Sequence, residues 1–288
     1  MKTEDMTRAQ LAERSILKKY NKVIWSRFIK GMKEYRMIDP GDRIAVCISG
    51  GKDSMLMAMC MKHLQKYSEI PFEARYIVMD PGYNPVNREK IIRNAAALEI
   101  PIEIFESTIF DAVADIEKNP CYLCARMRRG YLYSRAEDLG CNKIALGHHF
   151  DDVIETILMG VIYGAQFQTM MPKLHSSNFT GMELIRPLYM VREADIIAWA
   201  RYNGLEFLQC ACRFTEKCAE GDGTGVSKRR EIKELLCRLR ADNPLIDMNI
   251  FRSAENVNLE TVISYHKGDK YHSFLDDYSQ RGGSENDQ

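Results

Sequence analysis

An apolar segment that runs directly into a pair of glycines constrains the fold of this 288-residue chain more than any other feature. Residues 44–48 are short and apolar, which is typical of a buried strand. They are followed by Ser49-Gly50-Gly51-Lys52-Asp53-Ser54 and then by a stretch with helical composition. A buried strand that turns through glycines into a helix is the first part of a parallel α/β unit.

The rest of the chain repeats this alternation. Helices are expected after Ser54, after Asn84-Pro85, around 121–139, from Asp151 onward and at 192–202. Strands are expected at residues 43–48, 72–79, 102–105, 143–146, 184–188 and 206–208. Short apolar strands separated by helices predict a doubly wound, mostly parallel α/β sheet.

Both ends of the chain depart from this alternation of strands and helices. Residues 7–36 have apolar residues at three- and four-residue spacing, which predicts a helix. A basic helix at 227–240 and a last helical pair running to about 266 are expected near the other end. The predicted organisation is a helical extension (1–40), a catalytic domain (41–215), a helical region (216–275) and a disordered tail (276–288).

Composition excludes several classes of protein. The chain has 40 Lys plus Arg and 40 Asp plus Glu, so a globally basic nucleic-acid binder is not indicated. Its polar start does not resemble a signal peptide, and no apolar run reaches the roughly 18 residues of a membrane helix. We therefore expect a soluble cytoplasmic protein without a membrane partner. Its nine cysteines predict no disulfide framework, and Cys47, Cys60, Cys141 and Cys237 are expected to be buried.

The glycine loop has the chemistry of a phosphate site. Paired glycines let backbone N–H groups approach a phosphate, while Lys52 adds a cation and the following helix adds its dipole. The spacing matches neither a Walker loop nor a dinucleotide fingerprint. At the carboxyl end of a parallel strand, this loop is where such folds bind ligands.

A second loop is expected at the same edge of the sheet. Gly147-His148-His149-Phe150-Asp151-Asp152 follows the strand at 143–146 and opens a helix. Asp151 and Asp152 could orient magnesium or cap that helix. We expect a catalytic or magnesium-binding role for Asp151, and nucleotide contacts rather than metal contacts for His148 and His149.

Two cysteine clusters are candidates for metal or redox chemistry. Cys121 and Cys124 form a Cys-x-x-Cys pair near a helix start, where the thiol pKa is lowered. Cys210 and Cys212 follow a predicted strand, with Cys218 further on. Zinc, an iron–sulfur cluster and redox chemistry all remain open, although Cys-x-Cys fits the usual zinc spacing poorly.

The motif Ser49-Gly50-Gly51-Lys52-Asp53-Ser54 resembles the signature of the N-type ATP pyrophosphatases, the PP-loop superfamily. Further motifs narrow this resemblance to the tRNA 2-thiocytidine synthetase group, over residues of about 20 to 265. They are Cys121-x-x-Cys124-Ala-Arg126-Met-Arg128-Arg129-Gly130, Leu146-Gly147-His148-His149-x-Asp151-Asp152, Ile185-Arg186-Pro187-Leu188 and Arg192-Glu193-x-Asp195-Ile196.

This resemblance implies an adenine nucleotide alpha hydrolase-like fold and an enzyme that thiolates cytidine 32 of tRNA. ATP, Mg²⁺ and a 4Fe-4S cluster held by three cysteines are the implied cofactors, and a homodimer is implied. The sulfur donor would be a cysteine desulfurase persulfide or free sulfide. The implied nucleotide-binding residues are Ser49, Gly50, Gly51, Lys52, Asp53, Ser54, Gly147 and His148.

The implied catalytic residues are Asp53, Arg128, Asp151 and Cys212, and Asp151 is also the implied magnesium ligand. Cys121 and Cys124 carry over directly as cluster ligands. The group usually shows Cys-x-x-Cys in the later segment, whereas this chain has Cys210-Ala211-Cys212. We favour Cys212 as the third ligand over Cys210.

Basic residues on two predicted helices are candidate contacts to tRNA phosphates. Arg128 and Arg129 are close enough to Cys124 to reach ATP or an extruded base. The full set is Arg126, Arg128, Arg129 and Arg135 on the first helix and Lys228, Arg229, Arg230, Lys233, Arg238 and Arg240 on the second.

Three alternatives remain open at this stage. One is removal of sulfur from a thiolated base, for which the ATP loop has no evident use. A second is another adenylating enzyme of this fold, such as a lysidine-forming tRNA ligase, which has no use for clustered cysteines. The third is a non-catalytic, zinc-stabilised tRNA-binding module.

Overall fold

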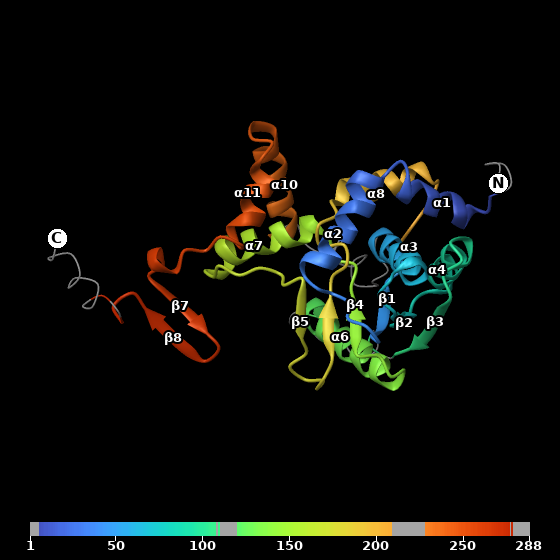
Figure 1. The fold of residues 1–288 in the computed structure, drawn as a ribbon, viewed down its shortest axis with the longest axis horizontal. Coiled ribbons are helices and arrows are strands. Elements are labelled where there is room, and N and C mark those ends of the chain that lie inside the picture. Colours follow the sequence, from blue (N-terminus) through green and yellow to red (C-terminus); the bar gives the residue numbers. More distant parts are fainter. Residues whose placement is uncertain (1–5, 108, 110–119, 209–227, 277, 279–288) are drawn as a thin grey trace.

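A six-stranded sheet with helices on both faces forms the body of the protein (Figure 1). The computed structural model describes residues 6–107, 109, 120–208, 228–276 and 278, with the backbone alone at 120–125. The strand order is β3-β2-β1-β4-β6-β5. The bounds are β1 (Arg43–Ile48), β2 (Glu73–Asp80), β3 (Ile102–Glu106), β4 (Lys143–Ala145), β5 (Lys173–His175) and β6 (Glu183–Ile185).

Every neighbouring pair in this sheet is parallel except β5 with β6. The predicted α/β class is therefore confirmed, with one antiparallel edge strand that the sequence did not reveal. Two strand predictions differ from the structure. The strand expected at 184–188 is paired only as far as Ile185, and residues 206–208 form no strand. Instead, the Leu208 amide donates to the Gly50 carbonyl at 3.3 Å.

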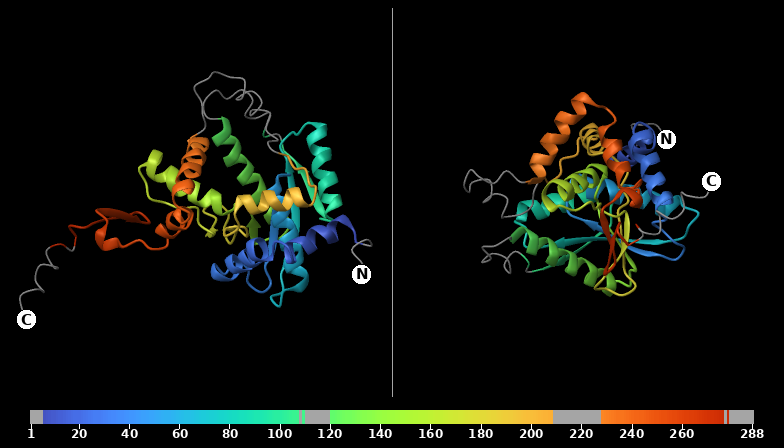
Figure 2. Two further views of the ribbon diagram at one scale, coloured as in Figure 1. Left: turned by 90° about the horizontal axis from the view of Figure 1, so that it is seen from above. Right: turned by 90° about the vertical axis from the view of Figure 1, so that its left-hand side faces the viewer.

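Alternate residues of β1 pack into two different cores. Ile44, Val46 and Ile48 face the larger core. This core is covered by α3 (Lys52–Tyr67), α4 (Pro85–Ala97), α7 (Phe150–Gly164) and α8 (Glu193–Tyr202). Ala45 and Cys47 face the smaller core, which is closed by α6 (Pro120–Asp138). The two layers are visible in the right-hand view of Figure 2. Strands buried on both faces explain the continuous apolar runs in the sequence.

Helix α3 is buried almost all round in its first half. Every residue from Ser54 to Met61 is buried, including Met55, Met57 and Met59. A helix that is apolar on every side lies between other elements rather than on the surface. It is here enclosed by the sheet, α8 and the amino-terminal helices.

The amino-terminal extension contains two helices instead of one. α1 (Arg8–Leu17) and α2 (Ser26–Glu34) are joined by a turn and a π-helical turn, η2 (Asn21–Trp25). The π turn inserts an extra residue, so that Ile24, Phe28 and Met32 remain buried below the break. The prediction of one helix over 7–36 is wrong because core packing corrects the helical register at this point.

The carboxyl-terminal region also differs from its prediction. α10 (Lys228–Asp242) and α11 (Ile246–Ser253) are helical, but η3 (Leu259–Thr261) is a short 3-10 turn. It is followed by an antiparallel hairpin of β7 (Ser264–Lys267) and β8 (Lys270–Ser273). The helical pair expected to run to about 266 thus ends at Ser253, and the helical region expected up to 275 contains only the short turn η3 and the hairpin beyond it. Gly268 adopts a φ of +62° in the hairpin turn, a conformation that favours glycine.

Three of the four cysteines predicted to be buried are buried, namely Cys47, Cys60 and Cys141. Cys237 is exposed on α10, so that prediction is wrong. No helix in the described part of the chain is long and apolar enough to cross a membrane.

Lys143 joins the sheet to the loop before β1. Its side chain is only 2% exposed, and its Nζ lies 2.7 Å from Asp42, 2.8 Å from Asp39 and 3.1 Å from Glu183. Burial opposes the charged form, but these carboxylates outweigh it and raise the Lys143 pKa. A buried ammonium surrounded by acids is stable only while its partners remain in place.

Lys143→Met should therefore destabilise the protein by about 3 to 5 kcal/mol, because Asp42 would remain buried without a counter-ion. Lys173 is the matched control, since it contacts Asp39 and Glu183 with a side chain that is 24% exposed. Urea unfolding should show a clearly smaller loss for Lys173→Met. Equal losses for the two variants would contradict the proposed dependence on burial.

Candidate active site

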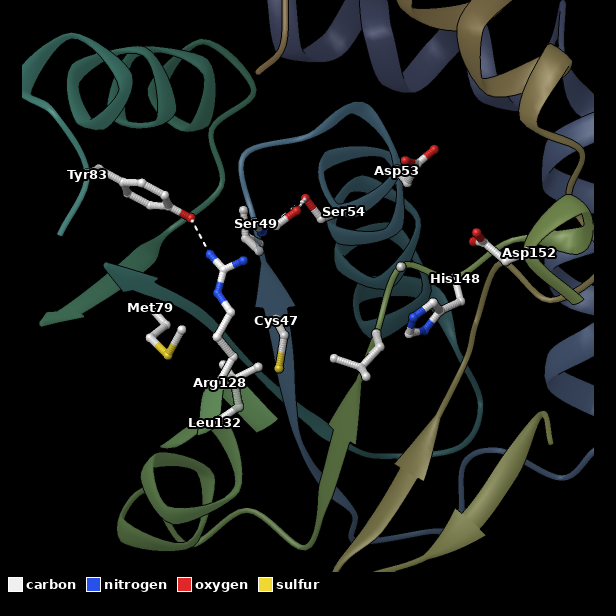
Figure 3. Close-up of a pocket in the computed structure, with 13 residues that line it drawn as sticks. Cys47, Ser49, Asp53, Ser54, Met79, Tyr83, Arg128, Leu132, His148 and Asp152 are labelled. Carbon is white, nitrogen blue, oxygen red and sulfur yellow. Dashed lines mark hydrogen bonds between the residues drawn. The ribbon is translucent and has the colours of Figure 1, made fainter. Parts of the chain in front are cut away.

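The candidate site lies at the carboxyl ends of β1 and β4. Strands β2 and β3 lie on one side of β1, and β4, β6 and β5 on the other. The strand order reverses between β1 and β4, the position at which such sheets bind ligands. A cavity of about 320 Å³ opens there (Figure 3). Its lining is Cys47, Ile48, Ser49, Asp53, Ser54, Met79, Tyr83, Arg128, Leu132, Leu146, Gly147, His148 and Asp152.

The first loop requires glycine for two reasons. Gly50 has a φ of +85°, and a Cβ there would lie 2.6 Å from Cγ1 of Ile91. Ser49 and Ser54 close the loop, with their hydroxyl oxygens 3.2 Å apart, and the Ser54 hydroxyl donates to the Gly51 carbonyl at 3.0 Å. Gly51 is the N-cap of α3 and makes no side-chain capping bond. The open amides at the start of α3 can therefore bind an anion.

The second loop approaches the first at Gly147. A Cβ on Gly147 would lie 3.0 Å from the Ser54 nitrogen and 3.1 Å from its Cα. Both contacts are to backbone atoms, which cannot swing aside. The absence of a side chain at Gly147 thus allows the two loops to meet.

Lys52, Asp53 and Glu193 form a chain of charges beside the cavity. Lys52 Nζ lies 3.2 Å from Asp53 Oδ2 and 3.0 Å from Glu193 Oε1. Burial opposes ionisation of Glu193, but Lys52, His149 and Lys233 outweigh it and lower the Glu193 pKa to about 2. Glu193 thus remains a carboxylate at neutral pH and holds Lys52 at the loop.

Asp53 has an unsatisfied oxygen. Its Oδ1 is buried and accepts no hydrogen bond from any described residue, and His149 Nε2 lies 3.9 Å away. Burial is the largest effect and raises the Asp53 pKa. A buried carboxylate oxygen without a donor is costly unless a ligand or ion satisfies it. Oxygen ligands of this kind suit Mg²⁺.

The two histidines of the second loop have different roles. His149 is buried and caps α7, accepting from the Asp152 amide at 3.4 Å while Asp152 Oδ2 accepts from the His149 amide at 2.9 Å. His148 lines the cavity, and its Nδ1 is buried with no partner among the described residues. Burial, followed by the charge of Arg186, lowers the His148 pKa to about 4. His148 is therefore a neutral polar group facing the cavity.

The structure gives Asp151 a different environment from Asp152. Asp151 accepts from the Glu193 amide at 2.7 Å and from Arg240 Nη2 at 2.6 Å, so both of its oxygens are occupied. It does not line the cavity, whereas Asp152 does. Asp151 thus fixes the start of α8, whereas Asp152 lies at the cavity, where its oxygens accept from the His149 amide and from Arg229 Nη2.

Helix α6 brings Arg128 into the cavity. The Arg128 guanidinium donates to the Tyr83 hydroxyl at 3.2 Å, next to the end of β1 (Figure 3). Cys121 and Cys124 belong to the start of the same helix, and Cys124 is one turn before Arg128. The predicted ligand Cys212 lies outside the described residues, as do Cys210 and Cys218.

A larger hollow of about 1060 Å³ adjoins the cavity. The two share Ser49, Asp53, Tyr83 and Arg128. The larger hollow continues past the start of α4 to the carboxyl end of α8, where Arg201 and Leu205 line it. The combined space thus has two parts. The smaller cavity beside the loop is largely apolar, and the larger hollow that leads to it is open and lined by several Lys and Arg side chains.

Four of the basic residues expected to contact tRNA pair with carboxylates of this protein, and one of these pairs, Arg230 with Glu234, lies within α10 itself. Arg229 pairs with Asp152 at 2.5 Å and Glu155 at 2.7 Å. Lys233 pairs with Glu193 at 3.1 Å, and Arg240 pairs with Asp151. This face of α10 therefore fixes the acidic edge of the site.

Sequence reasoning missed the residues that support the loop. Glu193 was part of a recognised motif, but nothing in the pattern showed that it pairs with Lys52. Tyr83 follows β2 and could have been suspected from its place at the sheet edge. Arg186 is buried and reaches the Met171 carbonyl, and burial, then Arg129, lowers its pKa to about 10. Its influence on His148 depends on folding and is not visible in the sequence.

The fold and the two loops define a PP-loop protein, and residues 18–212 match the model of the PP-loop domain family. The tRNA-cytidine(32) 2-sulfurtransferase of Deinococcus radiodurans is 41% identical over 182 residues, which are 62% of this chain and 60% of that protein. The enzyme of that name from Citrifermentans bemidjiense is 33% identical over 239 residues, 82% of this chain and 90% of that protein. The chain belongs to the family of tRNA-cytidine(32) 2-sulfurtransferases.

A solved structure agrees on the fold. The U34-tRNA thiolase of Methanococcus maripaludis, determined with its 4Fe-4S cluster, superposes with a TM-score of 0.62 at 22% identity. The match covers 80% of this chain and 76% of that one. This likeness agrees with the predicted doubly wound, mostly parallel α/β fold.

Gly147→Ala should destabilise the protein by about 1 to 3 kcal/mol and weaken ATP binding, because the new methyl group forces the two loops apart. Gly130 is the matched control, since a Cβ there meets nothing within 4 Å. In α6, Gly130→Ala should instead stabilise the protein by about 0.5 to 1 kcal/mol. Thermal unfolding and ATP titration of both variants provide the check, and full ATP affinity in Gly147→Ala would refute the close-approach argument.

His148 should make folding stability depend on pH. Its folded-state pKa of about 4 lies below the ordinary value of 6.5, so the unfolded chain binds this proton more readily between these values. Its contribution to stability is therefore lost as pH falls from 6.5 towards 4. His148→Gln should gain stability relative to the wild type on acidification through this range. Urea unfolding at pH 7, 5.5 and 4.5 tests this, and a constant difference between the two proteins would contradict it.

Proposed function

We propose that this protein uses ATP to replace the C2 oxygen of cytidine 32 in tRNA with sulfur. Its membership in a family named for this reaction supports the proposal. The single structural observation that carries it is the meeting of the PP-loop and α6 in one cavity. The loop provides the nucleotide site, and α6 brings Arg128 to that site from a helix that starts with the Cys121–Cys124 pair.

The nucleotide site fits ATP with magnesium. The amides at the start of α3 and Lys52 are placed for the phosphates, and Lys52 would exchange its contact with Glu193 for a phosphate oxygen. The unsatisfied Asp53 Oδ1 and the nearby Asp152 fit an oxygen-liganded cation. Asp53 and Asp152 are therefore the proposed magnesium ligands, and we assign Asp151 a positioning role.

The cysteines provide the donor set for a 4Fe-4S cluster. Cys121 and Cys124 would be two ligands, with Cys212 the proposed third and Cys210 its alternative. Three cysteines for four irons would leave one iron open, and such a cluster supplies a site that binds sulfide beside the nucleotide. Thiolate ligands favour iron–sulfur or zinc sites over magnesium.

The proposed reaction has two displacements without net redox change. The C2 oxygen of cytosine attacks the α-phosphate of ATP, and pyrophosphate leaves. Sulfide then attacks C2, the C2–O bond breaks, and AMP departs with the former base oxygen. Lys52 and the loop amides stabilise the negative charge that develops on the leaving pyrophosphate, while Arg128 is placed beside the reacting base or the α-phosphate.

The remaining assignments follow from this proposal. The sulfur donor would be free sulfide, which enters the second displacement directly, or a cysteine desulfurase persulfide, whose outer sulfur must first be reduced to sulfide by two electrons from a thiol. We further propose a cytoplasmic homodimer, the arrangement expected from the family resemblance.

Nucleoside mass spectrometry of bulk tRNA tests the function. In cells that lack this protein, 2-thiocytidine should be absent, and the wild-type gene should restore it. Cys124→Ala should fail to restore it, with a loss of at least about a hundredfold, because a cluster ligand is missing. The matched control is Cys237→Ala, since Cys237 is exposed on α10 and lies away from the cavity lining.

The outcomes separate the alternatives. Unchanged 2-thiocytidine in cells without the protein would reject cytidine as the substrate, and any other nucleoside that changes would identify the real one. Full activity of Cys124→Ala would reject the cluster. Iron and zinc analysis of the anaerobically purified protein distinguishes the 4Fe-4S assignment from a zinc site.

A further inference from the structure

A second basic hollow lies on the amino-terminal extension. Its volume is about 470 Å³, and its lining includes Arg8, Arg14, Lys18 and Lys19 of the α1 region with Tyr202 and Asn203 after α8. It belongs to neither the nucleotide loops nor α6. The sequence did not single out these residues, because they are spread through a helix of mixed composition.

Basic side chains dominate the lining of the hollow. No carboxylate from the described part of the chain lines it. Lys18 and Lys19 form no ion pair with any described residue, and both are exposed. This distinguishes them from the basic residues of α10, four of which are paired with the protein's own acids. A concave surface of like charges attracts a polyanion.

The hollow also offers an aromatic surface. The Lys19 Nζ lies 3.6 Å from the centroid of the Tyr202 ring, and Tyr202 is 57% exposed. Arg8 Nη2 donates to the Gly204 carbonyl at 2.5 Å, which fixes that cation at the rim. Cations next to an exposed aromatic ring are the combination that binds a nucleic-acid backbone and an unstacked base.

Its location connects the hollow to the active site. The larger hollow beside the PP-loop extends along α8 to Arg201. Tyr202 and Asn203, the next two residues, line the basic hollow. The two hollows therefore lie on either side of the carboxyl end of α8, and α1 and α8 lie next to each other in Figures 1 and 2. An RNA strand that enters the active site can continue along the surface across α8 to α1.

We propose that this hollow, formed by α1 and the end of α8, binds the tRNA sugar-phosphate backbone next to the nucleotide that enters the active site. This inference rests on the proposed function in that tRNA is the substrate. Lys18 and Lys19 contact phosphates, and Tyr202 supports a neighbouring base or ribose. The extension thus has a binding role besides packing on α3.

The test is the salt dependence of tRNA binding by Lys18→Gln/Lys19→Gln in the full-length protein. Two lost phosphate contacts should reduce the slope of log Kobs against log salt by about 2 and raise the Kd for a tRNA transcript by roughly tenfold at moderate salt. The matched control is Lys30→Gln/Lys33→Gln, which removes the same charge from exposed positions on α2 outside the hollow. The control should keep the wild-type slope.

Each result decides the proposal. An unchanged slope in Lys18→Gln/Lys19→Gln, or an equal decrease in the control, would overturn it. Equal melting temperatures of the two variants exclude misfolding as the cause, and Tyr202→Ala gives a second, uncharged test that should weaken binding without changing the slope. If the proposed function is wrong, the wild-type protein forms no 2-thiocytidine. If only the binding role of the hollow is wrong, the wild-type protein still forms 2-thiocytidine.

Discussion

The close contact between Gly147 and the backbone of Ser54 sets the geometry of the whole site. Strands β1 and β4 are neighbours in the sheet, so their following loops must share the space at the start of α3. Only a residue without a side chain lets them do so. Asp53 then faces His149, and His148 faces the cavity from the opposite loop. The distances between the groups that could act on a nucleotide thus depend on one backbone contact.

The charged side chains around this contact form a series of ion pairs in which acidic and basic residues alternate. Lys52 is shared by Asp53 and Glu193, and Glu193 is in turn shared with Lys233 of α10. A triphosphate at the loop would compete with Glu193 for Lys52, and Lys233 would keep Glu193 neutralised after that exchange. The carboxyl-terminal helix is therefore electrostatically part of the site, although it lies outside the segment that matches the PP-loop domain model. It also directly follows the segment that contains Cys212.

The sequence predicted those features that local patterns encode. The strand at 43–48, the glycine loop and the Asn84-Pro85 helix start all have short-range signals, and all are present. The break between α1 and α2 was missed because a π turn is decided by core packing around Ile24 and Phe28. The β7–β8 hairpin was missed because its short strands contain Lys, His and Ser, which give weak signals.

In the site, the loop residues were predictable, whereas the separate roles of Asp151 and Asp152 were not. Adjacent residues on a helix point in different directions, and only the fold shows which one faces the cavity.

The methionines of α3 have a consequence for observing the protein at work. Met55, Met57, Met59 and Met61 are buried directly behind the loop, and methionine is unbranched and adapts easily to small shifts of its surroundings. The amides that face a phosphate therefore belong to a helix, α3, whose packing can adapt to small shifts. The loop before it is tightly constrained. The ε-methyl groups provide four NMR signals within one helix. Their chemical shifts would record movements of α3 as nucleotide binds, without a label in the site itself.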